Sequence, residues 1–201
     1  MILNNISEDL IKWYQMNQRL LPWRTSKDPY TIWLSEIILQ QTRIDQGQKY
    51  WEKFLNKFPS IQNLASAKES EVLALWSGLG YYSRARNIHK TSKIIVKNYR
   101  NEFPSSSREL AELPGIGPYT AAAISSICFN EVIPALDGNA FRVYSRLFGI
   151  DLPIEKNIAI NTIKDLALPL ISKKQPGDSN QAIMDIGSGI CKPKNPKCFV
   201  C

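Results

Sequence analysis

Apolar side chains recur at intervals of three and four residues along almost the whole chain, and the apolar-polar alternation of strands is nearly absent. Such a repeat places the apolar residues on one face of an α-helix. With 201 residues, of which 44% are hydrophobic, the chain can bury a core as one large domain or as two smaller lobes. The sequence therefore predicts an all-α fold.

Capping residues and prolines predict where individual helices begin. Ser7 is a candidate N-cap for the first helix, and Asp28, which precedes a proline, is a candidate N-cap for a helix over about 29–42. Ser66, three residues before a glutamate, matches a capping box in front of a further helix. The other helices are expected over 45–57, 68–76, 82–99, 107–112, 119–129, 139–147, 155–171 and 179–189.

The formal net charge of +7 favours an anionic partner, of which nucleic acid is the commonest for a basic protein, although solvated lysine faces give the same charge. No apolar run reaches the length of a membrane span, and the first residues, MILNNISEDL, lack the order of a signal peptide. We therefore expect a cytoplasmic protein with no membrane partner. The single histidine, His89, argues against a histidine metal cluster and a Ser-His-Asp triad.

The segment LPGIGPYTAAAI, residues 113–124, places two glycines and two prolines between helical segments. Gly115 and Gly117 permit backbone conformations and close approaches that other residues do not, and Pro118 suits the first turn of the following helix. Such a turn directs backbone N–H groups and the positive end of a helix dipole outward, which favours binding of one phosphate. A tight helix-helix turn that binds nothing is the alternative.

Five segments, LPWR, WLSEIILQQTR, GLGYYSRARN, LPGIGPYTAAAI and LDGN, carry a resemblance to a known family. Through nearly its whole length the chain resembles the helix-hairpin-helix DNA glycosylase superfamily that includes endonuclease III, and within it the adenine DNA glycosylases of the MutY type. The resemblance implies two helical lobes around a DNA-binding cleft. A six-helix lobe over 22–130 would contain the helix-hairpin-helix, and residues 1–21 with 131–201 would form the second lobe.

The resemblance also implies an activity in base excision repair. The expected reaction is hydrolysis of the N-glycosidic bond of adenine that is mispaired with 8-oxoguanine or guanine. The expected partner is double-stranded DNA, bound by a monomer associated with the nucleoid. Members of this family usually continue into a separate domain that helps to recognise 8-oxoguanine. Nothing of that domain is present in this sequence, so no preference between 8-oxoguanine and guanine is predicted.

Tyr119 occupies an informative position in the glycine-containing segment. In bifunctional relatives, a lysine at this position attacks the sugar to give a Schiff base and strand cleavage. A tyrosine cannot form an imine, so the resemblance implies base removal by water without efficient lyase action. The alternative is a packed aromatic residue near a helix start. Other hypotheses for the chain are a thymine mismatch glycosylase, a bifunctional endonuclease III-like lyase, and a catalytically silent DNA-binding module.

Two carboxylates are candidates for the chemistry, because the leaving base must be protonated and the cationic sugar stabilised, as in O-glycoside hydrolysis. Glu36 has mostly apolar neighbours on its helix, where desolvation favours a protonated acid, and it matches the family glutamate that protonates adenine N7. Asp137 is a candidate N-cap and matches the catalytic aspartate of the superfamily. Asn139 is a candidate partner for a carboxylate or for the nucleophilic water, with a structural role as the alternative.

Extrusion of a paired adenine needs side chains that fill or brace the gap in the duplex. The resemblance implies this wedge role for Gln41 and Tyr82, and an aromatic ring can replace the lost stacking. Trp23 and Leu39 are candidates for the base pocket, with core packing as the alternative, and Gln181 is a candidate for a hydrogen bond to the adenine edge. The arginines expected to contact DNA, or otherwise to be solvated, are Arg24, Arg43, Arg84 and Arg86.

Three of the four cysteines lie within the last eleven residues, as Cys191, Cys198 and Cys201. Six residues separate Cys191 from Cys198, and two residues separate Cys198 from Cys201. This spacing resembles that of the first three ligands of the family's [4Fe–4S] loop. We therefore expect a loop over 191–201 with an incomplete or labile cluster, because the fourth cysteine is missing from this sequence. A zinc half-site and three ordinary thiols are the alternatives.

Overall fold

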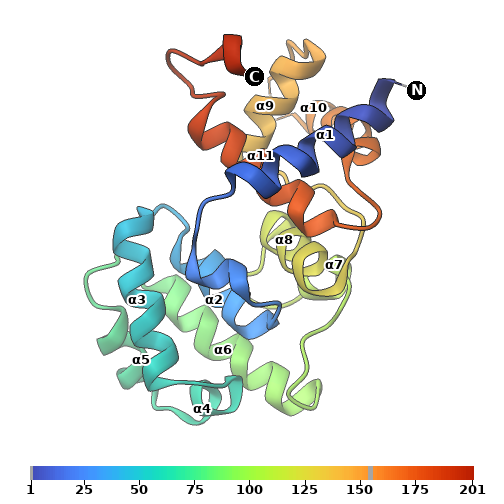
Figure 1. The fold of residues 1–201 in the computed structure, drawn as a ribbon. Helices are drawn as coiled ribbons and strands as arrows, with labels where there is room; N and C mark the ends of the chain where they lie inside the picture. The colour runs from blue at the N-terminus through green and yellow to red at the C-terminus, as the bar shows by residue number, and fades with distance from the viewer. Residues whose placement is uncertain (1, 154–155) are drawn as a thin grey trace. The chain divides into compact units, whose positions relative to one another are not determined.

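The computed structural model describes residues 2–153 and 156–201, and within them the ordered elements are all helical (Figure 1). The predicted all-α fold is confirmed. The chain divides into two compact units, one formed by Leu21–Ile124 and the other by the residues up to Leu20 together with Ser125–Cys201. We call these the hairpin unit and the terminal unit. The expected lobe boundaries are residues 22 and 130, whereas the second division between the units falls within helix α8 (Pro118–Phe129).

The hairpin unit is arranged around α6, which packs against α2, α4 and α5. Its core is rich in aromatic side chains in edge-to-face contact: the ring centroids of Phe54 and Trp76 are 5.7 Å apart, and those of Trp33 and Phe103 are 5.5 Å apart. Besides the start of α8, its helices are η1 (Pro22–Thr25), α2 (Pro29–Ile38), α3 (Ile44–Lys57), α4 (Ile61–Ser66), α5 (Glu69–Trp76), α6 (Ser83–Asn98) and α7 (Ser107–Leu110).

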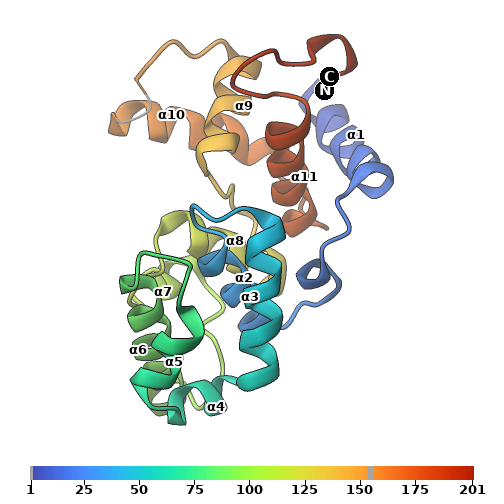
Figure 2. The same cartoon turned by 90° about the vertical axis from the view of Figure 1, so that its left-hand side faces the viewer.

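The terminal unit joins the first helix to the last part of the chain. Helix α1 lies along α11, which also packs against α9, while α10 contacts α9 and η2 (Figure 2). Tyr14, Tyr144 and Ile163 are among the buried residues of its core. Its helices are α1 (Ile2–Asn17), the end of α8, α9 (Gly138–Phe148), α10 (Asn157–Ala167), η2 (Leu168–Leu170), α11 (Pro176–Gly189) and η3 (Cys198–Val200). No helix of the described residues has both the length and the apolar character required to cross a membrane.

The predicted boundary of α2 is correct at its start and wrong at its end. Asp28 is the N-cap, as predicted, and its carboxylate accepts hydrogen bonds from the N–H groups of Tyr30 and Thr31 at 3.2 and 3.3 Å. The helix ends at Ile38 and not near residue 42. The reason is the backbone of Gln41, whose φ of 57° lies in the left-handed region and does not fit a right-handed helix.

Two other helix starts differ from the prediction. Ser7 lies inside α1 and is not its N-cap, because the helix already begins at Ile2. Ser66 ends α4, a six-residue helix too short to give a clear apolar repeat, and so it does not cap α5. The cap of α5 is Lys68, whose backbone N–H donates to the Glu71 carboxylate at 2.9 Å.

Candidate active site

The glycine turn connects α7 to α8 and exposes backbone donors. Gly115 has a φ of 78°, and a Cβ atom there would lie 2.7 Å from Cβ of Asn87, so both the conformation and the close packing require glycine. Gly117 is also exposed. Among the described residues, the N–H groups of Gly115 and Gly117 donate to no acceptor. The turn therefore presents two amides and the N-terminal end of α8, an arrangement that suits a phosphate.

Glu36 and Tyr119 are both half-buried in the hairpin unit, on α2 and at the second position of α8. Glu36 follows Ile32 and Trp33 by one helical turn, and these two are 2% and 1% exposed. The loop after α2 meets the first turn of α8, where Gln40 Nε2 donates to Thr120 Oγ1 at 3.4 Å. Glu36 thus lies on an apolar helix whose following loop contacts the start of the hairpin's second helix.

Asp137 is the N-cap of α9, as predicted. Its Oδ1 accepts a hydrogen bond from the Ala140 N–H at 2.7 Å, and its Oδ2 accepts one from Nδ2 of Asn139 at 3.0 Å. The structure therefore brings Asp137 and Asn139 together. Two donors and the positive end of a helix face the carboxylate, which suits a group that must carry a negative charge.

Arg142 extends this arrangement and was not identified from the sequence. Its Nη2 donates to Oδ1 of Asn139 at 2.8 Å and to the carbonyl of Gly187 at 2.7 Å, while its Nε donates to the Cys191 carbonyl at 2.8 Å. A continuous series of hydrogen bonds thus runs from the Asp137 carboxylate to the start of the cysteine loop. The available sequence signal was the spacing of three between Asn139 and Arg142 on one helix.

The cysteine loop is anchored on α9 by a second arginine. Arg146 donates to the carbonyls of Lys192 and Pro193 at 2.7 and 3.2 Å, and its Nη1 lies 3.4 Å from Sγ of Cys191. Cys191 is half-buried, whereas Cys198 and Cys201 are exposed. Within the described ranges, no three His, Cys, Asp or Glu side chains gather as a metal site. These residues do not by themselves fit a [4Fe–4S] cluster, which takes four thiolates, and its binding stays a prediction.

Two loops of the hairpin unit display exposed side chains on left-handed backbone. Gln41 is exposed in the loop after α2, with a φ of 57°. In the loop before α6, Tyr82 is 40% exposed, and the neighbouring Tyr81 is 66% exposed with a φ of 47°. Non-glycine residues in this region are costly and occur where the surrounding structure enforces them. Tyr81 was not singled out from the sequence, although it is the more exposed of the pair.

Of the two arginines of GLGYYSRARN that were expected to contact DNA, Arg84 binds carbonyls of the protein itself. Its Nη1 donates to the carbonyls of Ile37, Ile38 and Gln40 at 3.0, 3.1 and 2.6 Å, and its Nη2 donates to the Leu79 carbonyl at 3.2 Å. These donors are directed at the protein's own backbone. Arg84 therefore supports the structure of the two loops, and its contact with DNA stays a prediction.

The other three arginines keep a surface position. Arg43 is exposed and lies 3.2 Å from the carboxylate of Asp45, and Arg86 is exposed and lies 3.7 Å from that of Glu69. Arg24 is half-buried in η1. Exposed pairs of this kind contribute little to stability, so Arg43 and Arg86 can exchange partners at small cost.

The residues expected around the base are largely buried within the protein. Trp23 is 5% exposed and meets Trp51 edge to face, with ring centroids 5.7 Å apart. Leu39 is half-buried, and its Cδ2 would lie 2.6 Å from a Cβ atom on Gly47. Gln181 is buried in the terminal unit, where its Oε1 accepts a hydrogen bond from the Tyr14 hydroxyl at 2.8 Å. For Trp23 the structure shows the core position that was named as the alternative.

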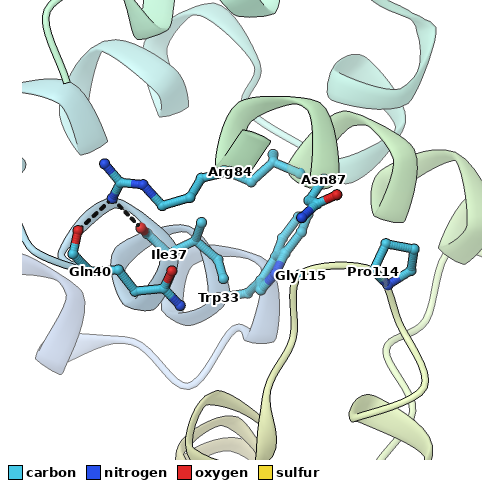
Figure 3. A pocket seen from close by; sticks show the side chains of 8 residues that line it. Trp33, Ile37, Gln40, Arg84, Asn87, Pro114 and Gly115 are labelled. Atoms are coloured by element: carbon cyan, nitrogen blue, oxygen red, sulfur yellow. Dashed lines mark hydrogen bonds between the residues drawn. The ribbon is translucent and has the colours of Figure 1, made fainter. Parts of the chain in front are cut away.

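A cavity of about 110 Å³ lies in the hairpin unit beside the glycine turn (Figure 3). Two buried donors in its lining, Nε1 of Trp33 and Nε of Arg84, have no hydrogen-bond partner among the residues that the structure describes. Burial lowers the pKa of the Arg84 guanidinium below its usual value. Neither Glu36 nor Asp137 borders the cavity. Its lining consists of Trp33, Ile37, Gln40, Arg84, Asn87, Ile88, Pro114 and Gly115.

Known proteins resemble this chain in sequence and in fold. Residues 34–166 match the family described as HhH-GPD superfamily base excision DNA repair protein. The chain belongs to this family. An HhH-GPD relative, the adenine DNA glycosylase of Buchnera aphidicola subsp. Schizaphis graminum, is 44% identical over 97% of this chain and 56% of its own length. The chain spans about half the length of the curated relatives it matches.

Solved structures of the same fold cover nearly the whole chain. A thermostable thymine-DNA glycosylase is 27% identical, with a TM-score of 0.89 over 99% of this chain and 92% of its own. A non-covalent endonuclease III-DNA complex is 21% identical, with a TM-score of 0.80 over 99% and 92% of the two chains. The HhH-GPD glycosylase fold expected from the sequence is therefore confirmed.

Proposed function

We propose that this chain is the catalytic region of a monofunctional DNA glycosylase that removes adenine paired with 8-oxoguanine or guanine in double-stranded DNA. The observation that carries the proposal is the Asp137 carboxylate, held by Ala140 and Asn139 at the start of α9. It is supported by the 44% identity to an adenine DNA glycosylase, compared with 27% identity to a thymine-DNA glycosylase.

In the proposed reaction, Glu36 gives its proton to N7 of the extruded adenine. The electron pair of the N-glycosidic bond then leaves with the base, and the deoxyribose becomes a cation. The Asp137 carboxylate stabilises this cation, and water adds to C1′ and loses one proton. Asn139 keeps Oδ2 of Asp137 oriented through its 3.0 Å hydrogen bond.

Tyr119 determines that the reaction ends at base removal. Its phenol carries no amine, so a Schiff base with the deoxyribose cannot form at this position. The product is an abasic site on an intact strand. Strand scission then requires alkali.

DNA binding is assigned to the exposed elements of the hairpin unit. The Gly115 and Gly117 amides bind one phosphate, and Arg24, Arg43 and Arg86 contact the backbone or bases. Gln41 and a tyrosine of the loop before α6 occupy the gap left by the extruded base, and the exposure of Tyr81 adds it to Tyr82 as a candidate. Trp23 and Leu39 support the base pocket, and Gln181 offers its Nε2 to the adenine edge, because its Oε1 already accepts from Tyr14.

A thymine mismatch glycosylase is the second candidate, favoured by the TM-score of 0.89 to the thymine-DNA glycosylase structure. One experiment separates the candidates. The protein is incubated with duplexes containing A opposite 8-oxoguanine, A opposite guanine, or T opposite guanine, and products are compared with and without alkali. Adenine release that needs alkali for scission supports the proposal. Thymine release, scission without alkali, or tight binding without turnover contradicts it and supports a rival.

A further inference from the structure

The two loops with exposed side chains share a backbone feature. In each, a non-glycine residue with left-handed φ, Gln41 or Tyr81, follows directly after a peptide whose carbonyl accepts a side-chain hydrogen bond. The φ of the next residue defines how that peptide is oriented relative to the next Cα atom. A donor that fixes the Gln40 or Gly80 carbonyl therefore holds the following residue in its strained conformation.

Arg84 supplies such donors to both loops. Its Nη1 donates to the Gln40 carbonyl at 2.6 Å, and its Nη2 lies 3.5 Å from the Gly80 carbonyl. The Gly80 carbonyl also accepts from Nε1 of Trp76 at 2.9 Å. The guanidinium lies over the rings of Trp76 and Tyr81, with Cζ 5.0 and 5.7 Å from their centroids. One side chain thus connects the two loops through their backbones.

A second contact fixes the far end of the loop before α6. The Tyr50 hydroxyl donates to the Ser77 carbonyl at 2.6 Å and would lie 2.5 Å from a Cβ atom on Gly78, whose φ is 97°. The loop is therefore anchored at both ends, by α3 and by Arg84. Because its strained residues are held before DNA arrives, ordering them on binding costs little.

We propose that Arg84 is a positioning residue that sets the conformation of both loops, so that Gln41 and Tyr81 enter the duplex as one coupled unit. This inference rests on the proposed function. It differs from the sequence expectation that Arg84 contacts DNA, because its donors bind protein carbonyls. The contacts of Arg84 with both loops require a guanidinium, since a lysine ammonium cannot direct donors in a plane toward two separate loops.

The first test compares Arg84→Met with Arg100→Met, which makes the same change at an exposed arginine beyond the other end of α6. We expect Arg84→Met to lower the single-turnover excision rate about tenfold or more, and Arg100→Met to leave it unchanged. The slope of log affinity against log salt separates the two roles of Arg84. A lost phosphate contact reduces this slope by about 0.9, whereas a lost positioning role leaves it unchanged. A reduced slope overturns the proposal.

The second test measures the energetic coupling between Gln41 and Tyr81. Tyr81→Ala and Gln41→Ala are combined with each other and with Arg84→Met, and 2-aminopurine beside the target base reports loss of stacking by its fluorescence. We expect the two loop variants to be non-additive when Arg84 is present and additive with Arg84→Met. A variant that only loses stability lowers the melting temperature without changing this coupling. Unchanged coupling overturns the proposal.

Arg84→Met removes the positive charge and all of the arginine's side-chain hydrogen bonds together. Arg84→Lys is therefore a second variant, because it retains the charge. Recovery of full activity with lysine contradicts the need for a planar guanidinium. The fluorescence and salt measurements need only DNA binding. If the wild-type protein binds DNA without releasing adenine, the proposed function fails, while the positioning of Gln41 and Tyr81 is still decided by these two measurements.

Discussion

At the scale of single residues, the two candidate carboxylates differ in what surrounds them. Asp137 accepts two hydrogen bonds at a helix N-terminus, where a negative charge is stabilised. Glu36 is half-buried and lies one turn after two buried apolar residues. In the proposed reaction, Asp137 is accordingly the cation stabiliser and Glu36 the proton donor.

Glu36→Gln is expected to lower adenine release by about a hundredfold or more, because glutamine cannot deliver a proton to the leaving base. The affinity for DNA should change little, since the side chain keeps its size and polarity. Single-turnover excision and equilibrium binding on the same duplex measure the two effects. A variant that remains fully active refutes the acid assignment.

His89 gives the hairpin unit a stability that depends on pH. It is the single histidine of the chain, is 3% exposed, and its Nε2 donates to the Ala67 carbonyl at 2.9 Å. Burial, and secondarily the nearby Lys93, lowers its pKa below the ordinary value of 6.5. The unfolded chain therefore binds a proton at a higher pH than the folded chain does.

We accordingly expect the free energy of unfolding to fall as the pH drops through about 6.5 and to level off below the folded-state pKa of His89. Urea unfolding between pH 7.5 and 5.5 measures this change. His89→Gln removes the titrating group, so its stability should vary less over the same interval. An identical pH dependence in the two proteins would exclude His89 as the source.

At the scale of helices, α11 approaches the start of α9 closely at one glycine. A Cβ atom on Gly187 would lie 2.7 Å from Cβ of Asn139, whereas one on Gly189 would meet nothing within 4 Å. Gly187→Ala should therefore displace Asn139 from Asp137 and lower the excision rate about tenfold, with little effect on DNA affinity. Gly189→Ala is the matched control. Equal rates for the two variants would show that Asn139 does not support Asp137.

The segment just after α1 is linked to α11 by an ion pair whose carboxylate is buried. Arg19 Nη2 lies 2.6 Å from Oδ1 of Asp185, whose side chain is 3% exposed. Asp185→Asn should lower the free energy of unfolding by about 2 kcal/mol, because an amide replaces the charged acceptor of the hydrogen bonds from Arg19. Asp9→Asn, which removes an exposed carboxylate 3.6 Å from Lys12, should have almost no effect. Denaturant titration of both variants tests this contrast.

Local signals predicted much of the fold and part of the site. The caps at Asp28 and Asp137 and the proximity of Asn139 to Asp137 depend on neighbours within three residues. The role of Arg84 depends on carbonyls more than forty residues earlier in the chain, and the bond from Arg142 to Cys191 spans 49 residues. No periodicity or capping pattern encodes such distant pairings, so tertiary packing decided them.

At the scale of the whole molecule, we expect the net charge of +7 to govern the proposed association with DNA. Each phosphate neutralised by a lysine or arginine releases counterions, so the logarithm of affinity should fall linearly with the logarithm of salt concentration. A slope of about −0.9 for each phosphate contact is expected on duplex DNA. DNA-binding titrations at salt concentrations from about 50 to 200 mM measure this slope. A flat response would contradict the proposed DNA interface.

The terminal unit is assembled from both ends of the chain, since α1 packs on α11. On the ribosome, the hairpin unit is complete in one continuous stretch and can fold as soon as it emerges. Helix α1 is made first but finds its partner last. Its apolar face stays uncovered until translation has passed residue 189, so apolar surface of this helix is exposed while the rest of the chain is made.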